Sequence, residues 1–186
     1  MRWRTKVEGL QVNPREIARI KSLANRRDYG ESLATCDALL QSDSGDSTDV
    51  LRVRAYVHSR AGNFDSAIDD YRAILVSGTA QLRDWYLAAD NALEAERYQD
   101  AAEWFSEAIR LGDLQGETWF RSASLFYLSY CRLMAGDPEE AMSMLSSATS
   151  LDPDIELYLP GLGACSAGKL QAEIRKRMSG DRPRRA

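Results

Sequence analysis

The sequence predicts an all-α fold in which a helix–turn–helix unit repeats about four times along 186 residues. Three segments share one pattern: NFDSAIDDYRAIL at 63–75, RYQDAAEWFSEAI at 97–109 and DPEEAMSMLSSAT at 137–149. A fainter copy, DYGESLATCDALL, occupies 28–40. No segment alternates apolar and polar residues over a sustained stretch, so we expect no sheet.

A small residue anchors each copy, and its position sets the period. The anchors are Ser32, Ala67, Ala101 and Ala141, which stand 35, 34 and 40 residues apart. A small side chain lets the second helix of a pair approach the first closely, and a larger side chain follows four residues later on the same helix face. A fixed period of about 34 residues is typical of stacked helical hairpins.

The ends of the first helices carry recognisable signals. Asn13 followed by Pro14 predicts an N-cap and the first helical residue. The segment SDSGDSTD at 42–49 is polar and reads as a loop between the first two helix pairs. Gly62 and Gly136 fall between the helices of their pairs, where a positive φ favours glycine.

The fourth copy is about six residues longer than the others, and we expect its first helix to begin a turn early, near Glu117 or Trp119. The proline of LDP at 151–153 ends the last pair. After a break at PGLG, an amphipathic helix over 167–178 is expected to cover the apolar end of the last pair. Eight paired helices and this ninth helix complete the predicted order.

The segment GACSAGKL at 163–170 nearly matches the phosphate-binding pattern G-x-x-x-x-G-K-[ST]. Leu170 stands where that pattern needs a hydroxyl for magnesium, and the chain before it predicts helices instead of the required parallel sheet. We therefore interpret Gly163 to Gly168 as hinge residues and expect no nucleotide site.

The charge distribution is uneven. Residues 1–30 and 169–186 each carry a net charge of +5, whereas 31–168 carry −14, within a total of −4. The acidic middle argues against nucleic-acid binding by the body of the protein. The basic ends leave open a tether to nucleic acid or to an anionic membrane. No apolar run is long enough to span a membrane, and MRWRTKVEGL does not resemble a secretory signal.

The sequence contains few residues suited to catalysis. His58 is the only histidine, and the three cysteines are far apart and odd in number. We therefore expect no metal site, no cofactor and no disulfide framework, and a cytoplasmic location. Cys165 lies near Lys169, which could lower its thiol pKa, but no other residue supports a thiol enzyme. The protein is expected not to be an enzyme.

Residues 14–157 resemble the tetratricopeptide repeat (TPR) family. The resemblance implies a right-handed superhelix of about four repeats plus a C-terminal capping helix. The small residue expected in each first helix is kept as Ala55, Ala89 and Ser129 but is Ile20 in the first copy. The expected organisation is a basic leader at 1–13, repeats at 14–47, 48–81, 82–116 and 117–157, and a glycine-rich turn, capping helix and basic tail at 158–186.

In this family the first helix of each pair lines a concave groove, so family geometry implies which side chains face inward. At or near those positions, the residues expected to contact a partner are Lys21, Arg52, Tyr56, Tyr86, Asp90, Phe126, Tyr127 and Tyr130. Tyrosine and arginine are enriched at binding hot spots. An alternative is that residues 158–178 fill the groove themselves.

One subset of the family grips the C-terminal carboxylate of heat-shock chaperones with lysines, asparagines and an arginine. The matching positions here include Ile17, Tyr56 and Asp90, so this clamp is absent. We expect a non-catalytic adaptor or scaffold that binds a helical or extended segment of another protein. A secretion chaperone, a toxin-neutralising partner or an enzyme are alternatives, and an oligomer is possible because repeat arrays can stack.

Overall fold

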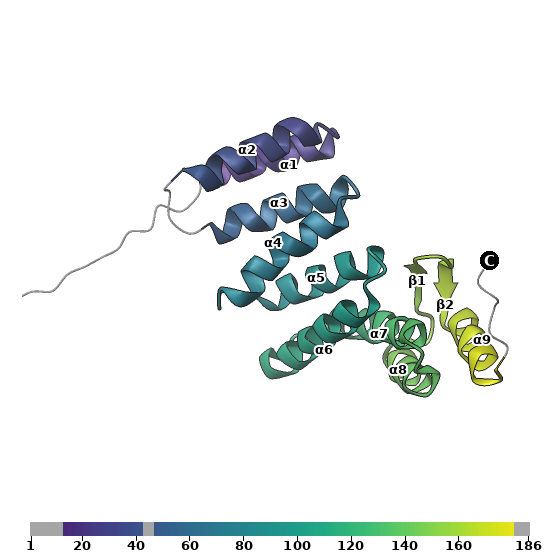
Figure 1. The fold of residues 1–186 in the computed structure, drawn as a ribbon. Helices are drawn as coiled ribbons and strands as arrows, with labels where there is room; N and C mark the ends of the chain where they lie inside the picture. The colour runs from purple at the N-terminus through teal and green to yellow at the C-terminus, as the bar shows by residue number, and fades with distance from the viewer. Residues whose placement is uncertain (1–12, 43–46, 181–186) are drawn as a thin grey trace, which may run out of the picture. The chain divides into compact units, whose positions relative to one another are not determined.

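The computed structural model describes residues 13–42 and 47–180, which form nine helices and one two-stranded hairpin (Figure 1). The chain divides into two compact units, Met1–Ala80 and Gln81–Ala186. The predicted all-α repeat fold, with eight paired helices followed by a ninth, is confirmed over the described residues. None of the helices within these ranges is long and apolar enough to cross a membrane.

The first unit contains two helix pairs. They are α1 (Pro14–Asn25), α2 (Tyr29–Gln41), α3 (Thr48–Arg60) and α4 (Phe64–Val76). As predicted, Asn13 caps α1, and its side chain accepts from the backbone N–H of Arg15 at 3.0 Å. Apolar side chains from α1, α2 and α3, including Ile20, Cys36 and Val53, form a buried core in this unit.

The second unit contains two further pairs and the C-terminal elements. The paired helices are α5 (Leu82–Glu94), α6 (Tyr98–Gln115), α7 (Arg121–Ala135) and α8 (Pro138–Leu151). Asp137 caps α8 by accepting from the N–H of Glu140, and Pro138 is the first residue of this helix. The α5–α6, α6–α7 and α7–α8 neighbours all pack against one another.

The repeat period is visible in the backbone of the turns. The turn of each pair holds one residue with positive φ: Arg27 at 68°, Gly62 at 78°, Glu96 at 57° and Gly136 at 93°. The predicted role of the two glycines is confirmed. In the first and third pairs a side-chain-bearing residue takes the same left-handed conformation, which costs on the order of 1 kcal/mol relative to glycine.

The extra residues of the fourth copy lie elsewhere than predicted. Instead of starting near Glu117 or Trp119, α7 begins at Arg121, and α6 extends to Gln115 before Gly116 ends it with φ 72°. The buried ring of Phe120 packs on Gly112 of α6, where an added Cβ would lie 2.5 Å from the ring. The longer α6 supplies the surface that this ring covers.

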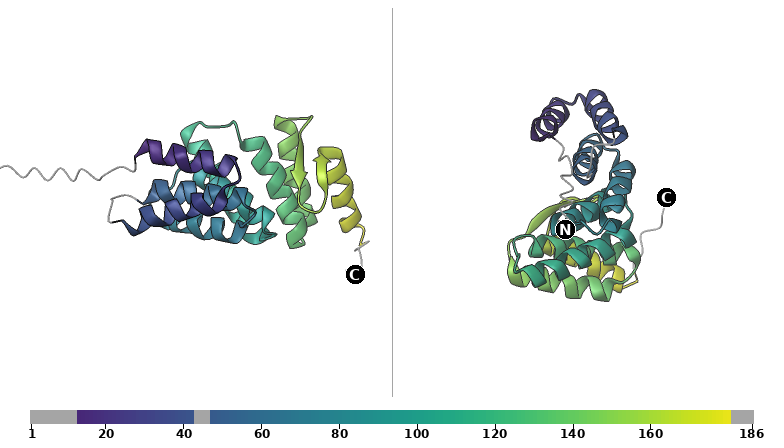
Figure 2. Two further views of the ribbon diagram at one scale, coloured as in Figure 1. Left: turned by 90° about the horizontal axis from the view of Figure 1, so that it is seen from above. Right: turned by 90° about the vertical axis from the view of Figure 1, so that its left-hand side faces the viewer.

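The expectation of no sheet is wrong at one place. Strands β1 (Glu156–Leu159) and β2 (Gly163–Ser166) pair antiparallel, with Leu157 opposite Cys165 and Leu159 opposite Gly163. Strand β1 contacts α7, and strand β2 contacts the last helix, α9 (Ala167–Met178). In the left view of Figure 2 the hairpin lies between the green helices and the yellow α9. Four-residue strands are too short to show sustained alternation, so the hairpin depends on packing that the sequence pattern does not display.

Lys169 has a structural role in this hairpin. Its ammonium group donates to the carbonyl oxygens of Leu162 at 2.8 Å and Ala164 at 3.0 Å. The supposed hinge, Gly163 to Gly168, is instead strand β2 followed by the first residues of α9, and the Ser166 side chain caps that helix. The predicted amphipathic helix is confirmed, with Leu170 and Ile174 fully buried.

Candidate functional site

The predicted contact residues divide between the two units, and each group is described within its own unit. Lys21, Arg52 and Tyr56 belong to the first unit, on α1 and α3. The others belong to the second unit, on α5 and α7: Tyr86, Asp90, Phe126, Tyr127 and Tyr130.

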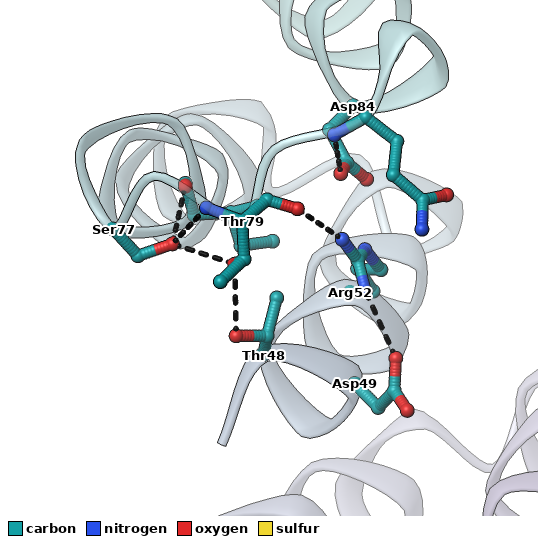
Figure 3. A network of polar contacts seen from close by, with 8 residues as sticks. Thr48, Asp49, Arg52, Ser77, Thr79 and Asp84 are labelled. Carbon is teal, nitrogen blue, oxygen red and sulfur yellow. Dashed lines mark hydrogen bonds and ion pairs between the residues drawn. The ribbon is translucent and has the colours of Figure 1, made fainter. Parts of the chain in front are cut away.

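In the first unit, two of the three residues hold neighbouring segments together. Arg52 donates to the carboxylate of Asp49 at 2.9 Å and to the carbonyl oxygen of Thr79 at 3.1 Å (Figure 3). The Tyr56 hydroxyl donates to Oδ1 of Asn25 at 2.9 Å. Lys21 is exposed on α1. Arg52 and Tyr56 therefore already serve the packing of this unit.

Figure 3 also shows hydroxyl contacts around the end of α4. Ser77 and Thr79 hydroxyl oxygens are 2.7 Å apart, and Thr79 and Thr48 hydroxyl oxygens are 3.3 Å apart. Separately, in the second unit, Asp84 accepts from the backbone N–H of Gln81 at 2.9 Å and closes the start of α5. These contacts fix helix ends.

In the second unit, two predicted tyrosines rest on one buried ring. Phe105 of α6 is fully buried, and Tyr127 of α7 stacks on it with ring centroids 5.5 Å apart and planes 19° apart. Tyr86 of α5 meets the same ring edge-on at 5.7 Å. Tyr86 and Tyr127 are both only partly buried, so two aromatic side chains that pack on Phe105 reach the protein surface.

Trp119 extends the same cluster into solvent. Its ring centroid is 6.2 Å from that of Tyr86 and 5.2 Å from that of the buried Phe120. The Trp119 side chain is nevertheless 65% exposed. From the sequence, Trp119 was expected only as a possible start of a helix. It lies near Tyr86 because of the way the chain turns between α6 and α7.

Two carboxylates lie on the same face of α5 as Tyr86. Asp90 follows one helical turn later, and Glu94 follows one turn after that. Both are partly buried, and neither accepts a hydrogen bond or forms an ion pair with any residue that the structure describes. Glu94 was not among the predicted contact residues, although its spacing from Asp90 could have indicated it.

The electrostatics follow from this partial burial. Burial, and then the nearby charge of Glu94, raises the pKa of Asp90 to about 6. Burial also raises the pKa of Glu94. The pKa of Tyr127 rises to about 12 through burial and then the charges of Asp90 and Glu94, which indicates that these groups lie near one another. We call Tyr86, Asp90, Glu94, Trp119 and Tyr127 the aromatic–acidic face.

Phe126 and Tyr130 do not belong to this face. Their exposed fractions are 0% and 3%, so neither offers surface to a partner in this structure, which corrects their predicted accessibility. The Tyr130 hydroxyl donates to the carbonyl oxygen of Pro160 at 2.5 Å, and its ring meets Tyr98 edge-on at 5.8 Å. The C-terminal segment thus covers part of α7, and the filling of the groove by 158–178 stays a prediction.

The cysteines are not activated thiols. Cys36, Cys131 and Cys165 are all free and buried. Burial raises the pKa of Cys36 to about 11 and that of Cys131 to about 12. Burial also raises the pKa of Cys165 despite the nearby Lys169, so the suggestion of a lowered pKa is wrong. In the described ranges no group of three His, Cys, Asp or Glu side chains is arranged to hold a metal ion.

The paired helices, their period and the left-handed turn residues define a helical repeat protein. The tetratricopeptide repeat family matches residues 17–83, 52–115 and 86–154, which together cover more than half of the chain. The chain belongs to the tetratricopeptide repeat family. Proteins of this family are in general non-catalytic modules for protein–protein interaction.

Individual relatives are more distant. A MAU2 chromatid cohesion factor homolog from Nematostella vectensis is 31% identical over 91 residues, which span 46% of this chain and only 15% of that protein. YrrB, a TPR protein with an unusual peptide-binding site, is 20% identical and has a TM-score of 0.61 over 74% of this chain and 68% of its own. MamA from AMB-1 is 14% identical, with a TM-score of 0.66 over 89% and 82%. At such identities the two solved structures show the fold alone.

Proposed function

We propose that this chain is a non-catalytic protein-binding module whose aromatic–acidic face holds a helical or extended segment of a partner protein. The observation that carries the proposal is the exposure of Trp119 beside Tyr86, which rests together with Tyr127 on the buried ring of Phe105. Tryptophan and tyrosine supply much of the binding energy at interfaces, because they bury a large apolar area while keeping a polar group.

The family and one solved relative support this choice of ligand. YrrB is described as having an unusual peptide-binding site, and the present chain shares its repeat fold. The predicted alternatives of a secretion chaperone or a toxin-neutralising partner are particular forms of the same role. The predicted tether through the basic ends depends on 1–30 and 169–186, of which 1–12 and 181–186 lie outside the described residues.

The test compares two exposed aromatic residues of the second unit. Trp119 belongs to the aromatic–acidic face, whereas Tyr158 of β1 is 66% exposed outside it. Wild type, Trp119→Ala and Tyr158→Ala would be expressed with an affinity tag in the source cells, and co-purifying proteins would be identified after chemical crosslinking. Circular dichroism and thermal melting would first establish that all three are equally folded.

We expect one or more partners that the wild type and Tyr158→Ala retain and that Trp119→Ala loses by at least tenfold. Loss of one buried aromatic anchor costs about 2 kcal/mol or more in binding, which corresponds to such a factor. A partner retained equally by all three proteins would place the binding surface elsewhere and reject the proposed face. Steep salt dependence of that retained binding would favour the basic ends.

A further inference from the structure

The acids of the second unit differ in how they are satisfied. Several acids of this unit form an ion pair with an arginine: Asp100 with Arg97, Glu107 with Arg110, Asp113 with Arg121, Glu140 with Arg132 and Glu173 with Arg177. Asp90 and Glu94 are partly buried and yet have no cation within ion-pair distance among the described residues. The two carboxylates therefore lack a counter-charge among the described residues, and a bound ligand can supply one.

This arrangement is unfavourable in the isolated protein. Like charges one helical turn apart destabilise a helix, and partial burial adds a cost for the ionised form. Asp90 shows both effects, since burial and Glu94 both favour its protonated state. Uncompensated charges of this kind concentrate at binding and catalytic sites, where a ligand supplies the missing partner.

The aromatic part of the face suits one kind of cation in particular. Tyr86 contacts Trp119 at its side, and Tyr127 lies close enough to Asp90 for the carboxylate to raise its pKa. A planar guanidinium can stack on an aromatic ring while it donates two parallel hydrogen bonds to a carboxylate. An ammonium group makes only the point-charge interaction, so arginine fits better than lysine.

We propose that the partner segment bound by the aromatic–acidic face carries an arginine next to an apolar residue, with the guanidinium paired to Asp90 and Glu94 and the apolar residue against Trp119. This inference rests on the proposed function and adds the chemistry of the partner. It excludes acidic segments and C-terminal carboxylates as ligands, because Asp90 and Glu94 would repel them.

The experiment uses a phage-displayed library of random peptides, about 12 residues long, selected on the full-length protein. Four proteins are compared: wild type, Asp90→Asn with Glu94→Gln, Trp119→Ala, and a charge-matched control. The control carries Glu139→Gln and Asp154→Asn, two exposed acids of the same unit outside the face. One enriched peptide is then synthesised, and its affinity is measured by fluorescence anisotropy.

We expect the wild type and the control to enrich peptides in which arginine adjoins an apolar residue. The Asp90→Asn, Glu94→Gln protein should bind the synthetic peptide at least tenfold more weakly. Replacing the peptide arginine by citrulline, which removes the charge and keeps the shape, should weaken binding to the wild type equally. It should have little effect on the protein that lacks both carboxylates.

The affinity for this peptide should also depend on pH. Asp90 must be ionised to pair with arginine, and the groups near it are Glu94 and Tyr86 on its own helix and Tyr127 on α7. With the pKa of Asp90 at about 6, binding should strengthen roughly tenfold between pH 5 and pH 7.5. The tyrosines do not titrate there, so the variant without the two acids should show a flat profile.

Other outcomes separate the inference from the proposed function. Enriched peptides that need Trp119 but show no preference for arginine would overturn the inference and leave the function standing. No enrichment, or equal binding to Trp119→Ala, would overturn both. If deleting residues 1–12, which include Arg2, Trp3 and Arg4, raises the peptide affinity tenfold, the face is occupied by the chain's own leader, and the external partner is rejected.

Discussion

The hydroxyl of Tyr130 on α7 donates a hydrogen bond of 2.5 Å to the carbonyl oxygen of Pro160, thirty residues later in the chain. Pro160 begins the turn of the β1–β2 hairpin, so this bond joins the hairpin to the last repeat. Arg177 of α9 adds a second connection by donating to the carbonyl oxygen of Leu133 at 3.1 Å. The C-terminal segment is thus attached to α7 at two points, and the Tyr130 hydroxyl makes one of these attachments.

Tyr130→Phe removes the hydroxyl and leaves the aromatic packing in place. A hydrogen bond of this kind contributes about 1 kcal/mol to stability, so we expect that loss in the free energy of unfolding. Hydrogen exchange at β1 and β2 should accelerate about fivefold, because the hairpin opens more often. Tyr158→Phe, on an exposed tyrosine of the same hairpin, should change neither quantity. Equal behaviour of the two variants would contradict the role given to Tyr130.

The repeat pattern predicted the helix pairs because their signals are local. Asn13 and Pro14 mark the start of α1, and the glycines at 62 and 136 mark two of the turns. The hairpin and the burial of Tyr130 were not predicted, because both depend on where the segment after α8 folds back. That position is set by tertiary packing against α7, which has no periodic signature in the sequence.

The candidate site was predicted in part. The family position of Tyr86 and Asp90 on α5 placed them on one stripe, and the structure adds Glu94 one turn later. Trp119 was missed because its place beside Tyr86 depends on the length of α6. The sequence assigned the extra residues of the fourth copy to α7, whereas the left-handed Gly116 ends α6 four turns after Ala101.

A second prediction concerns the buried ion pair of the first unit. Arg54 of α3 donates to both carboxylate oxygens of Asp70 on α4, at 2.6 Å and 3.0 Å, and also to Asp37 of α2 at 2.7 Å. The Asp70 residue is only 4% exposed. This arginine therefore connects three successive helices of the unit.

Asp70→Asn should destabilise the protein by roughly 2–4 kcal/mol, because it leaves Arg54 partly buried without its main counter-charge. Urea unfolding followed by circular dichroism measures the loss. The neighbouring Asp69→Asn is the control, since Asp69 is exposed and should change stability by about 0.5 kcal/mol or less. If both variants lose the same stability, net charge and not the ion pair is responsible.

A third prediction tests the corner that positions Trp119. Gly112 lies inside α6, where an alanine Cβ would come within 2.5 Å of the Phe120 ring and 2.7 Å of the Glu117 carbonyl oxygen. Gly112→Ala should therefore cost about 1–3 kcal/mol, although alanine favours helices. Gly30→Ala in α2 meets nothing within 4 Å and should stabilise by about 0.5–1 kcal/mol. Stabilisation by both changes, measured by urea unfolding, would show that Phe120 does not pack on Gly112.

The last prediction concerns the cost of holding Asp90 without a cation. Its pKa is raised in the folded protein to about 6 from 3.8, so the folded state binds a proton more tightly than the unfolded state. Folding therefore favours the protonated carboxyl group, and the free energy of unfolding falls as the pH rises from 3.8 to about 6. Asp90→Asn imitates the protonated form at every pH.

The stability gained by Asp90→Asn should therefore be near zero below pH 4 and grow to roughly 1–2 kcal/mol at pH 7.5, a value reduced because the side chain is only partly buried. Urea unfolding of the wild type and Asp90→Asn across this pH range measures the gap between their free energies of unfolding. The gap between the wild type and Glu139→Gln should not change with pH. A gap that shrinks with rising pH would mean that a cation of the protein itself stabilises Asp90. The expected growth would instead show that the fold gives up stability at this carboxylate, as happens where residues are retained for binding at the expense of stability.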